Sequence, residues 1–168
     1  MPEQGWIEYS TAQGRLRLNG VEMHCPAFDV TNAGVLWTRP RRRFGNTTIP
    51  FVAGDLANPV RIAAATYGMR MTVSGVYDMD GVYWRDDGLS SPMEGLERTL
   101  DFLESEVFEP ATPPDATIDG DLLMPSGDLR VAPDGVQITA VDAPPTGHPV
   151  IRVTFDLVVP QPLLVAGS

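Results

Sequence analysis

Residues 91–108 have the only strong helix pattern in a chain whose other segments have the pattern of short strands and turns. Ser91 and Glu94 have capping-box spacing, and Pro92 falls at the first helical position, where its missing N–H costs nothing. Apolar side chains recur at steps of three and four residues and share one face: Met93, Leu96, Leu100, Leu103 and Val107. The pattern predicts a mainly β fold, a β-sandwich or barrel flanked by one α-helix whose apolar face packs on the sandwich.

The opposite face of this helix is acidic. We name it the acidic strip, and it consists of Glu94, Glu97, Asp101, Glu104 and Glu106. The simplest interpretation of a charged helix face is that it is solvated. The alternative is that the strip contacts a neighbouring subunit.

Two short turn sequences predict β-hairpins. Asn19-Gly20, the dipeptide most typical of a type I′ turn, interrupts the strand pattern of residues 16–23. The sequence Asp78-Met79-Asp80-Gly81 separates an alternating segment, residues 69–77, from residues 82–84. We therefore expect one hairpin at each of these turns.

The clearest strand pattern covers residues 150–159. Ile151, Val153, Phe155 and Leu157 point to one face of this strand, and we expect it to run through the core. Shorter strands are expected at residues 6–9, 119–124, 129–131 and 136–141, and mostly loop at 45–59.

Length and composition favour one β-rich domain. A chain of 168 residues that is 43% apolar can bury one core, so residues 1–168 are expected to form a single domain with a candidate N-terminal arm (1–14) and a C-terminal tail (161–168). The 16 glycines and 16 prolines are spread along the chain, which favours many turns.

The charge disfavours two classes of partner. A net charge of -10 argues against binding to nucleic acid or to an anionic membrane, because both require a basic surface. No apolar run approaches the roughly twenty residues that span a bilayer, and residues 1–4 lack the form of a signal peptide. The lone Cys25 cannot form an internal disulfide, which fits assembly in a reducing cytoplasm.

No residue pattern specifies catalysis, a cofactor or a metal. Asp78, Asp80, Asp86 and Asp87 gather near one turn, but they lack the spacing of an EF-hand. His24 and Cys25 are adjacent, so on a strand they point to opposite faces, and a structural cysteine is the better interpretation. Phosphate-loop and nucleophile-elbow motifs are absent, and among 22 acidic residues a carboxylate pair carries no specificity. We therefore expect a protein that is not an enzyme.

The basic residues include one cluster. All 12 are arginines, and four of them form what we name the Arg cluster: Arg39, Arg41, Arg42 and Arg43. Alone, such a cluster could be a phosphate site or a nonspecific basic surface. Beside the acidic strip it predicts a symmetric ring, in which arginines of one subunit meet carboxylates of the next. The candidate subunit-interface residues are Arg39, Arg41, Arg42, Arg43, Glu94, Glu97, Asp101 and Glu104.

Four segments occur in an order that supports this hypothesis: Asn19–Phe28, Arg39–Arg43, Gly95–Leu103 and Val153–Leu157. Together they resemble the minor tail proteins of long-tailed (siphovirus-type) actinobacterial bacteriophages, which are related to the N-terminal, ring-forming domain of distal tail proteins. The resemblance extends from about Leu16 to Pro160 and rests on the order and spacing of the segments.

The resemblance implies a tail-tube-like domain that forms a hexameric ring between the tail tube and the tail tip or baseplate. In such a ring the acidic strip would either contact the next subunit or face the tail lumen, where negative charge would keep passing DNA from adhering. The implied partners are other copies of the chain, the tail tube protein, a tail-tip or baseplate hub protein and the tape-measure protein. The implied location is the virion tail, after assembly in the host cytoplasm. Few residues follow Pro160, so we expect an adaptor without a second, carbohydrate-binding domain.

Two alternatives stay open. A tail-terminator or head-tail connector subunit would have the same class of fold. A virion carbohydrate-binding β-sandwich would use exposed aromatic side chains as sugar platforms, with Trp37, Tyr83 and Trp84 as candidates. Packing in a core or an interface is the more frequent use of such aromatic side chains.

Overall fold

Two ten-residue strands, β4 (Ala65–Ser74) and β8 (Val150–Val159), pair antiparallel along their whole length. They are the centre of a four-stranded sheet in the order β3-β4-β8-β7, with β3 (Phe28–Val30) and β7 (Gln137–Asp142) at its edges. Ile151, Val153, Phe155 and Leu157 of β8 are all buried. The prediction that residues 150–159 form a core strand is confirmed.

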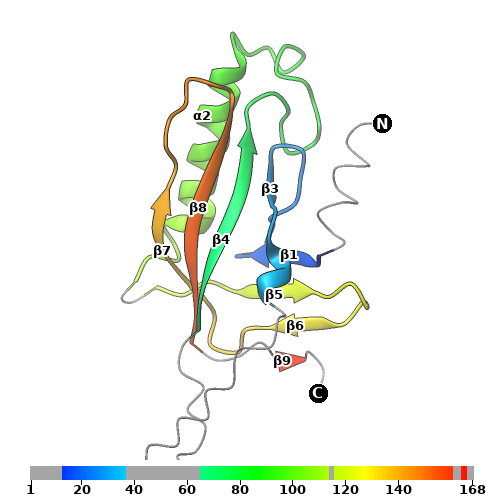
Figure 1. Ribbon diagram of the computed structural model, residues 1–168. Helices are drawn as coiled ribbons and strands as arrows, with labels where there is room; N and C mark the ends of the chain where they lie inside the picture. The colour runs from blue at the N-terminus through cyan, green and yellow to red at the C-terminus, as the bar shows by residue number, and fades with distance from the viewer. Residues whose placement is uncertain (1–12, 37–64, 114–115, 161–163, 166–168) are drawn as a thin grey trace, which may run out of the picture.

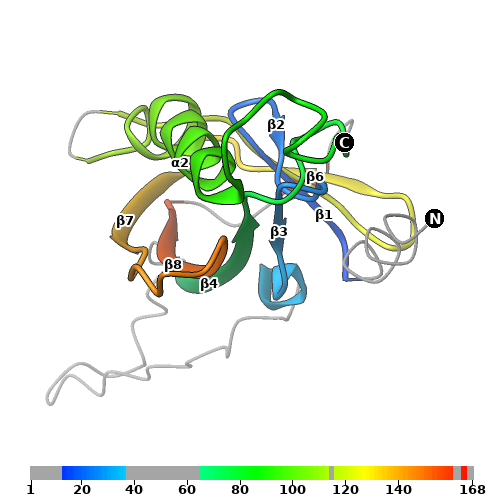
Figure 2. The same ribbon diagram turned by 90° about the horizontal axis from the view of Figure 1, so that it is seen from above.

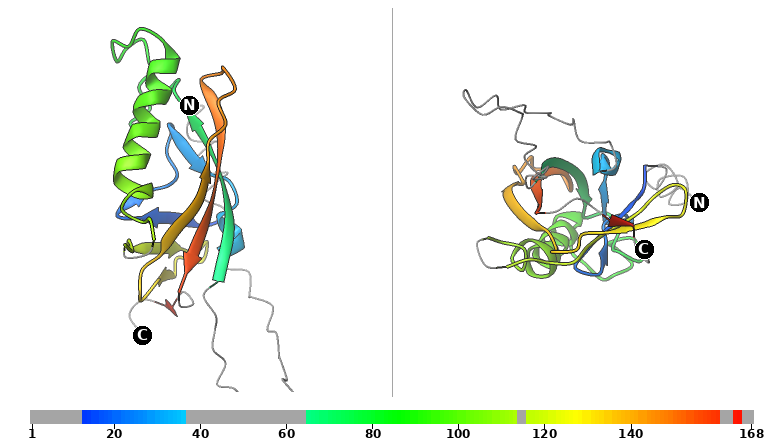
Figure 3. Two further views of the ribbon diagram at one scale, coloured as in Figure 1. Left: turned by 90° about the vertical axis from the view of Figure 1, so that its left-hand side faces the viewer. Right: turned by 90° about the horizontal axis from the view of Figure 1, so that it is seen from below.

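A second antiparallel sheet crosses the lower part of the first (Figure 1; Figure 3, left). Its order is β2-β1-β5-β6-β9. The strands are β1 (Arg15–Leu18), β2 (Val21–Glu22), β5 (Gly120–Leu123), β6 (Leu129–Val131) and β9 (Leu164–Val165). The computed structural model describes residues 13–36, 65–113, 116–160 and 164–165, and the account below concerns these residues.

The predicted helix forms and covers the upper part of the four-stranded sheet. Helix α2 (Pro92–Leu103) continues as a π-helical turn, η2 (Glu104–Phe108), and the described chain has one further short helix, the 3₁₀ turn η1 (Ala33–Leu36). Viewed from above, α2 lies against the concave side of the curved sheet (Figure 2). The described residues therefore form a mainly β fold, a β-sandwich with one α-helix, as the sequence predicts.

The apolar face of α2 and η2 enters the core that both sheets share. Leu96, Leu103 and Val107 are at most 5% exposed. The rings of Phe108 and Phe155 lie 5.5 Å apart, so η2 packs directly on β8. Burial of each large apolar side chain contributes roughly 1.5–3 kcal/mol to folding, which explains why the helix is held on the sheet.

Two glycines let the first turn of α2 approach the end of β4. A Cβ atom on Gly75 would overlap the carbonyl oxygen of Pro92 and the amide nitrogen of Leu96, and one on Gly95 would overlap the carbonyl oxygen of Gly75. Both glycines are buried. The helix is thus in backbone contact with the strand, which sets the position of α2 relative to the sheet.

A buried histidine joins the two sheets. The His24 Nδ1 atom lies 2.8 Å from Asp29 Oδ1 on β3, and Nε2 accepts a hydrogen bond of 2.9 Å from the backbone N–H of Leu16 on β1. Because Nε2 is an acceptor, the ring proton lies on Nδ1 and is donated to Asp29. His24 and Asp29 are 3% and 4% exposed, so each satisfies the other away from water.

The two predicted hairpins have different outcomes. The turn at Asn19-Gly20 is confirmed, with Leu18 paired to Val21 and both turn residues at positive φ. The turn at residues 78–81 also forms, but only a single bridge, Tyr77 to Tyr83, joins its two sides. Strand β4 pairs instead with β8 over ten residues on one side and with β3 over three residues on the other, so residues 82–84 add no strand to this sheet.

Other predictions have separate outcomes. The strands expected within 119–124, 129–131 and 136–141 form as β5, β6 and β7. Met93, expected on the buried helix face, is 43% exposed, because the first turn of α2 lies at the border of the sheet beside an open groove. The strand expected at residues 6–9, the loop expected at 45–59 and the Arg cluster lie outside the described residues.

Candidate functional site

The start of α2 is held by a variant of the predicted capping box. Ser91 is the N-cap, and its hydroxyl accepts a hydrogen bond of 3.3 Å from the N–H of Glu94. The Glu94 carboxylate accepts hydrogen bonds of 2.8 Å and 2.7 Å from the N–H and hydroxyl of Ser90, one residue earlier than the usual partner. These bonds from Ser90, together with nearby Arg98, lower the pKa of Glu94.

Glu94→Gln should remove part of the acid sensitivity of this helix start. A carboxyl whose pKa is lowered by folding stabilises the folded state above its unfolded pKa, and that stability is lost as pH falls through the folded value. We expect helical circular dichroism of the wild type to decline more steeply than that of Glu94→Gln between about pH 5 and pH 2. Glu97→Gln is the matched control, and a wild-type slope in Glu94→Gln would contradict the assignment.

An open groove of about 700 Å³ runs between α2 and the loop that joins β7 to β8. We name it the α2 groove. Its lining on the helix side comes from Ser90 to Asp101, and on the other side from Ala143 to Ile151. The lining residues are Ser90, Ser91, Met93, Glu94, Leu96, Glu97, Leu100, Asp101, Ala143, Pro145, Thr146, Gly147, His148 and Ile151.

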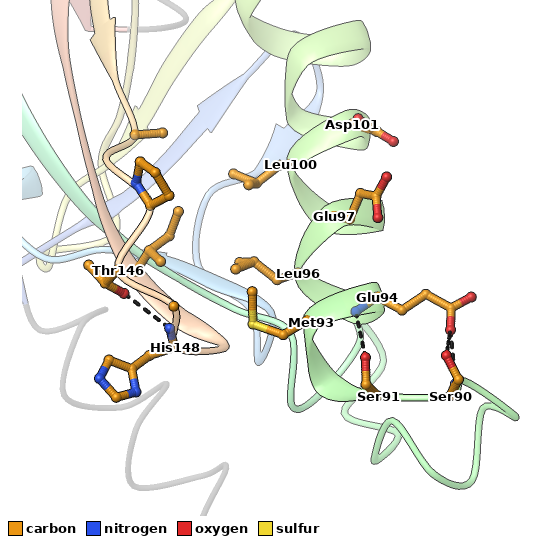
Figure 4. A pocket seen from close by; sticks show the side chains of 14 residues that line it. Ser90, Ser91, Met93, Glu94, Leu96, Glu97, Leu100, Asp101, Thr146 and His148 are labelled. Atoms are coloured by element: carbon orange, nitrogen blue, oxygen red, sulfur yellow. Dashed lines mark hydrogen bonds between the residues drawn. The ribbon is translucent and has the colours of Figure 1, made fainter.

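The groove has an apolar interior and an acidic rim. Met93, Leu96 and Leu100 point from α2 toward the loop that carries Thr146 and His148 (Figure 4). Glu97 and Asp101 lie along the outer side of the helix in the same view. A ligand in this groove would therefore meet apolar side chains first and carboxylates at one border.

A β-bulge in β7 precedes the loop side of the groove. The register of β7 on β8 runs from Thr139 opposite Asp156 to Asp142 opposite Thr154, which inserts one extra residue. Ala140, inside this bulge, has a φ of 53°, a backbone conformation that non-glycine residues rarely adopt. Bulges bend the strand that carries them, and this one lies directly before the segment that faces α2.

The acidic strip has the exposure that a contact surface requires. Glu97, Asp101, Glu104 and Glu106 are exposed, whereas Glu94 is half-buried and engaged with Ser90. The one ion pair that the strip makes among the described residues joins Glu94 to Arg98 at 3.9 Å. Glu97, Asp101 and Glu104 thus form no ion pair with another residue that the structure describes, and Glu97 and Asp101 also border the groove.

The sequence-predicted interface residues are therefore only partly brought together. Glu94, Glu97 and Asp101 line the α2 groove, and Glu104 lies one turn further along the helix surface. Arg39, Arg41, Arg42 and Arg43 lie outside the described residues. Sequence reasoning missed the loop from Ala143 to His148, for which the only signals were its proline-rich composition and one histidine.

The aromatic candidates form a surface cluster elsewhere. The ring of Tyr83 lies 5.8 Å from that of Tyr77 and 5.6 Å from that of Trp84, and the Arg85 guanidinium lies over Trp84 at 5.2 Å. Tyr83 is 37% exposed, while Trp84 is half-buried. Trp37 lies outside the described residues.

The aspartates at the turn beside this cluster have structural partners. Asp78 accepts hydrogen bonds from the N–H groups of Asp80 and Val82 at 2.9 Å and 2.8 Å. A hydrogen bond with the Asp78 side chain raises the pKa of Asp87, since two adjacent carboxyl groups favour retaining a proton. Within the described ranges, no three acidic, histidine or cysteine side chains are placed to hold a metal ion.

His24 and Cys25 do not form a nucleophile and base. Both ring nitrogens of His24 are used in buried hydrogen bonds, as described above. Cys25 is a free, buried thiol, and its burial raises the pKa of the thiol, which disfavours the reactive thiolate.

Comparisons of the chain with protein-family models, with curated proteins and with solved structures found no match. In the part of the chain that the structure describes, no helix is both long and apolar enough to cross a membrane.

Proposed function

We propose that this protein is a structural subunit of a bacteriophage virion, a distal-tail adaptor that assembles into a ring of six copies between the tail tube and the tail tip. The observation that supports the proposal most directly is the set of exposed acids Glu97, Asp101 and Glu104 on helix α2, which form no ion pair with another described residue. The order of the four segments that resemble minor tail proteins supports it independently.

Ring closure requires two different patches on each subunit, because a heterologous contact repeats around the axis. The acidic strip is one such patch, and the Arg cluster is the basic counterpart that the sequence offers. In this proposal the neighbours along the tail axis are the tail tube protein, a hub protein and the tape-measure protein.

Charge reversal of the Arg cluster should convert the oligomer to monomer. We expect the full chain to elute as an oligomer and to form ring particles in electron micrographs, and Arg41→Glu, Arg42→Glu and Arg43→Glu combined to abolish both. The control combines Arg17→Glu, Arg70→Glu and Arg152→Glu, three exposed arginines of the sheets. Retention of the rings in the first variant, or equal loss in both, would count against the assigned contact.

A carbohydrate-binding module of the virion is the second candidate, and the exposed Tyr83 beside Trp84 favours it. Glycan-array binding by the wild type that Tyr83→Ala abolishes would support this candidate. For the other alternative, a tail terminator or head-tail connector, the deciding measurement is the position of a labelled chain along the tail axis.

A further inference from the structure

We propose that the α2 groove is the receptor for residues 37–44 of a neighbouring copy, the segment that contains the Arg cluster. The inference rests on the proposed ring and specifies which surfaces meet in it. Its evidence is the chemistry of the groove, the composition of the segment and the distance between the groove and the chain ends that flank the segment.

The groove and the segment are complementary in charge. Glu94, Glu97 and Asp101 line the groove on the helix side, and the last two form no ion pair within the described ranges of the chain. The segment from Trp37 to Phe44 contains four arginines and no acidic residue. Guanidinium groups bind carboxylates with paired hydrogen bonds, so each exposed acid of the rim offers a site for one arginine.

The groove and the segment also both carry apolar side chains that can pack against each other. Met93 is 43% exposed and points into the groove with Leu96 and Leu100 (Figure 4). An aromatic residue stands at each end of the segment, Trp37 and Phe44. Large aromatic side chains beside arginines are the residues that most often anchor protein interfaces. Insertion of one of them would cover the apolar wall of the groove.

The chain ends that flank the segment lie far from the groove of the same copy. Leu36 shares a small cavity with Leu157 and Val159, and Ala65 pairs with Val159, so both ends lie at the last residues of β8. The groove lies at the other end of β8, beside Ile151. Leu157 follows Ile151 by six positions in β8, which is about 20 Å along a strand.

This separation favours a neighbouring copy as the source of the segment. Arg39 follows Leu36 by three residues and Arg41 by five, which limits their backbones to about 10 Å and 18 Å from Leu36 in a fully extended chain. The backbone of Arg39 therefore falls short of the roughly 20 Å to the groove of its own copy, and that of Arg41 approaches it only when the segment is fully extended. A second copy can present the segment without this restriction.

The test measures binding of a synthetic peptide of residues 37–44 to the full chain, diluted below the concentration at which it assembles. We expect saturable binding that weakens with salt, and a loss of at least about tenfold in affinity when Glu97→Arg and Asp101→Arg are combined. The matched control, Asp128→Arg with Asp134→Arg, makes the same charge change at two exposed aspartates outside the groove and outside the acidic strip, and it should bind as the wild type does.

Three results would overturn the inference. The first is equal loss of binding in both double variants, which would indicate general charge attraction. The second is a ring that survives Glu97→Arg combined with Asp101→Arg, which would show that the ring forms without contacts in this groove. The third is binding of the peptide by the Arg-cluster variant but not by the wild type. That result would mean that, in the wild type, the segment already occupies the groove of its own copy. Absence of any oligomer would instead contradict the proposed function, and the peptide titration would still decide whether the groove binds the segment.

Discussion

Gly75→Ala should lower the free energy of unfolding by about 3 kcal/mol, the upper part of the range for overpacked sites. The added methyl would overlap backbone atoms of Pro92 and Leu96, and backbone cannot rotate away as a flexible side chain can. Relief requires α2 to move off β4, which would expose part of the shared core. For a domain of this size the loss corresponds to a decrease in Tm of about 9 °C.

Gly95→Ala tests the same contact from the helix side. Alanine is favoured over glycine inside a helix by about 1 kcal/mol, so this variant would be stabilising if the site had space. The new methyl would overlap the carbonyl oxygen of Gly75, and we expect a net loss of about 2 kcal/mol. Because the two glycines touch, the double variant should lose less than the sum of the single losses.

The matched control for both variants is Gly68→Ala in β4. Its Cβ would meet nothing closer than Asp156 Oδ1 at 3.9 Å, so stability should stay the same or rise slightly. Thermal and urea unfolding of the wild type and the four variants measure these differences. Wild-type stability in Gly75→Ala would mean that helix and strand do not approach as described.

His24→Ala should have the second large effect, a loss of about 4 kcal/mol, because it breaks a buried hydrogen-bonded pair and leaves a void. The variant leaves the Asp29 carboxylate without its histidine donor and the N–H of Leu16 without its acceptor. Both groups belong to the junction between the sheets, so unfolding should remain one cooperative transition at a lower denaturant concentration.

Two further variants separate this hydrogen-bond network from loss of volume. Asp29→Asn keeps an acceptor of the same shape for Nδ1–H and should cost only about 1 kcal/mol. His148→Ala removes the other histidine of the chain, which is exposed, and should change stability by less than about 0.5 kcal/mol. A loss in His24→Ala no larger than that in His148→Ala would contradict the assigned role.

The helix could be located from sequence because its signals are local. Ser91, Pro92 and Glu94 specify its start, and the recurrence of Leu96 and Leu103 specifies its buried face. The alternation in residues 150–159 identified β8 for the same reason, since every second side chain of a half-buried strand must be apolar. These local patterns were sufficient to predict a mainly β fold with one flanking helix.

Tertiary structure decided everything that depends on contacts between distant segments. Gly75 and Gly95 look like ordinary glycines in the sequence, and only their backbone contact explains why neither can carry a methyl. No sequence pattern identified the hydrogen-bond partners of His24, because only the fold brings it between Leu16 and Asp29.

The acidic strip shows both contributions. Its charge and its helical spacing were determined by the sequence, because both depend only on residues within a few turns of one another. Its division into Glu94, which caps the helix, and Glu97 and Asp101, which border a groove, depends on Ser90 and on a loop some fifty residues further along the chain. Local periodicity predicts a face, but the partner of a face is set by chain segments that only folding brings together.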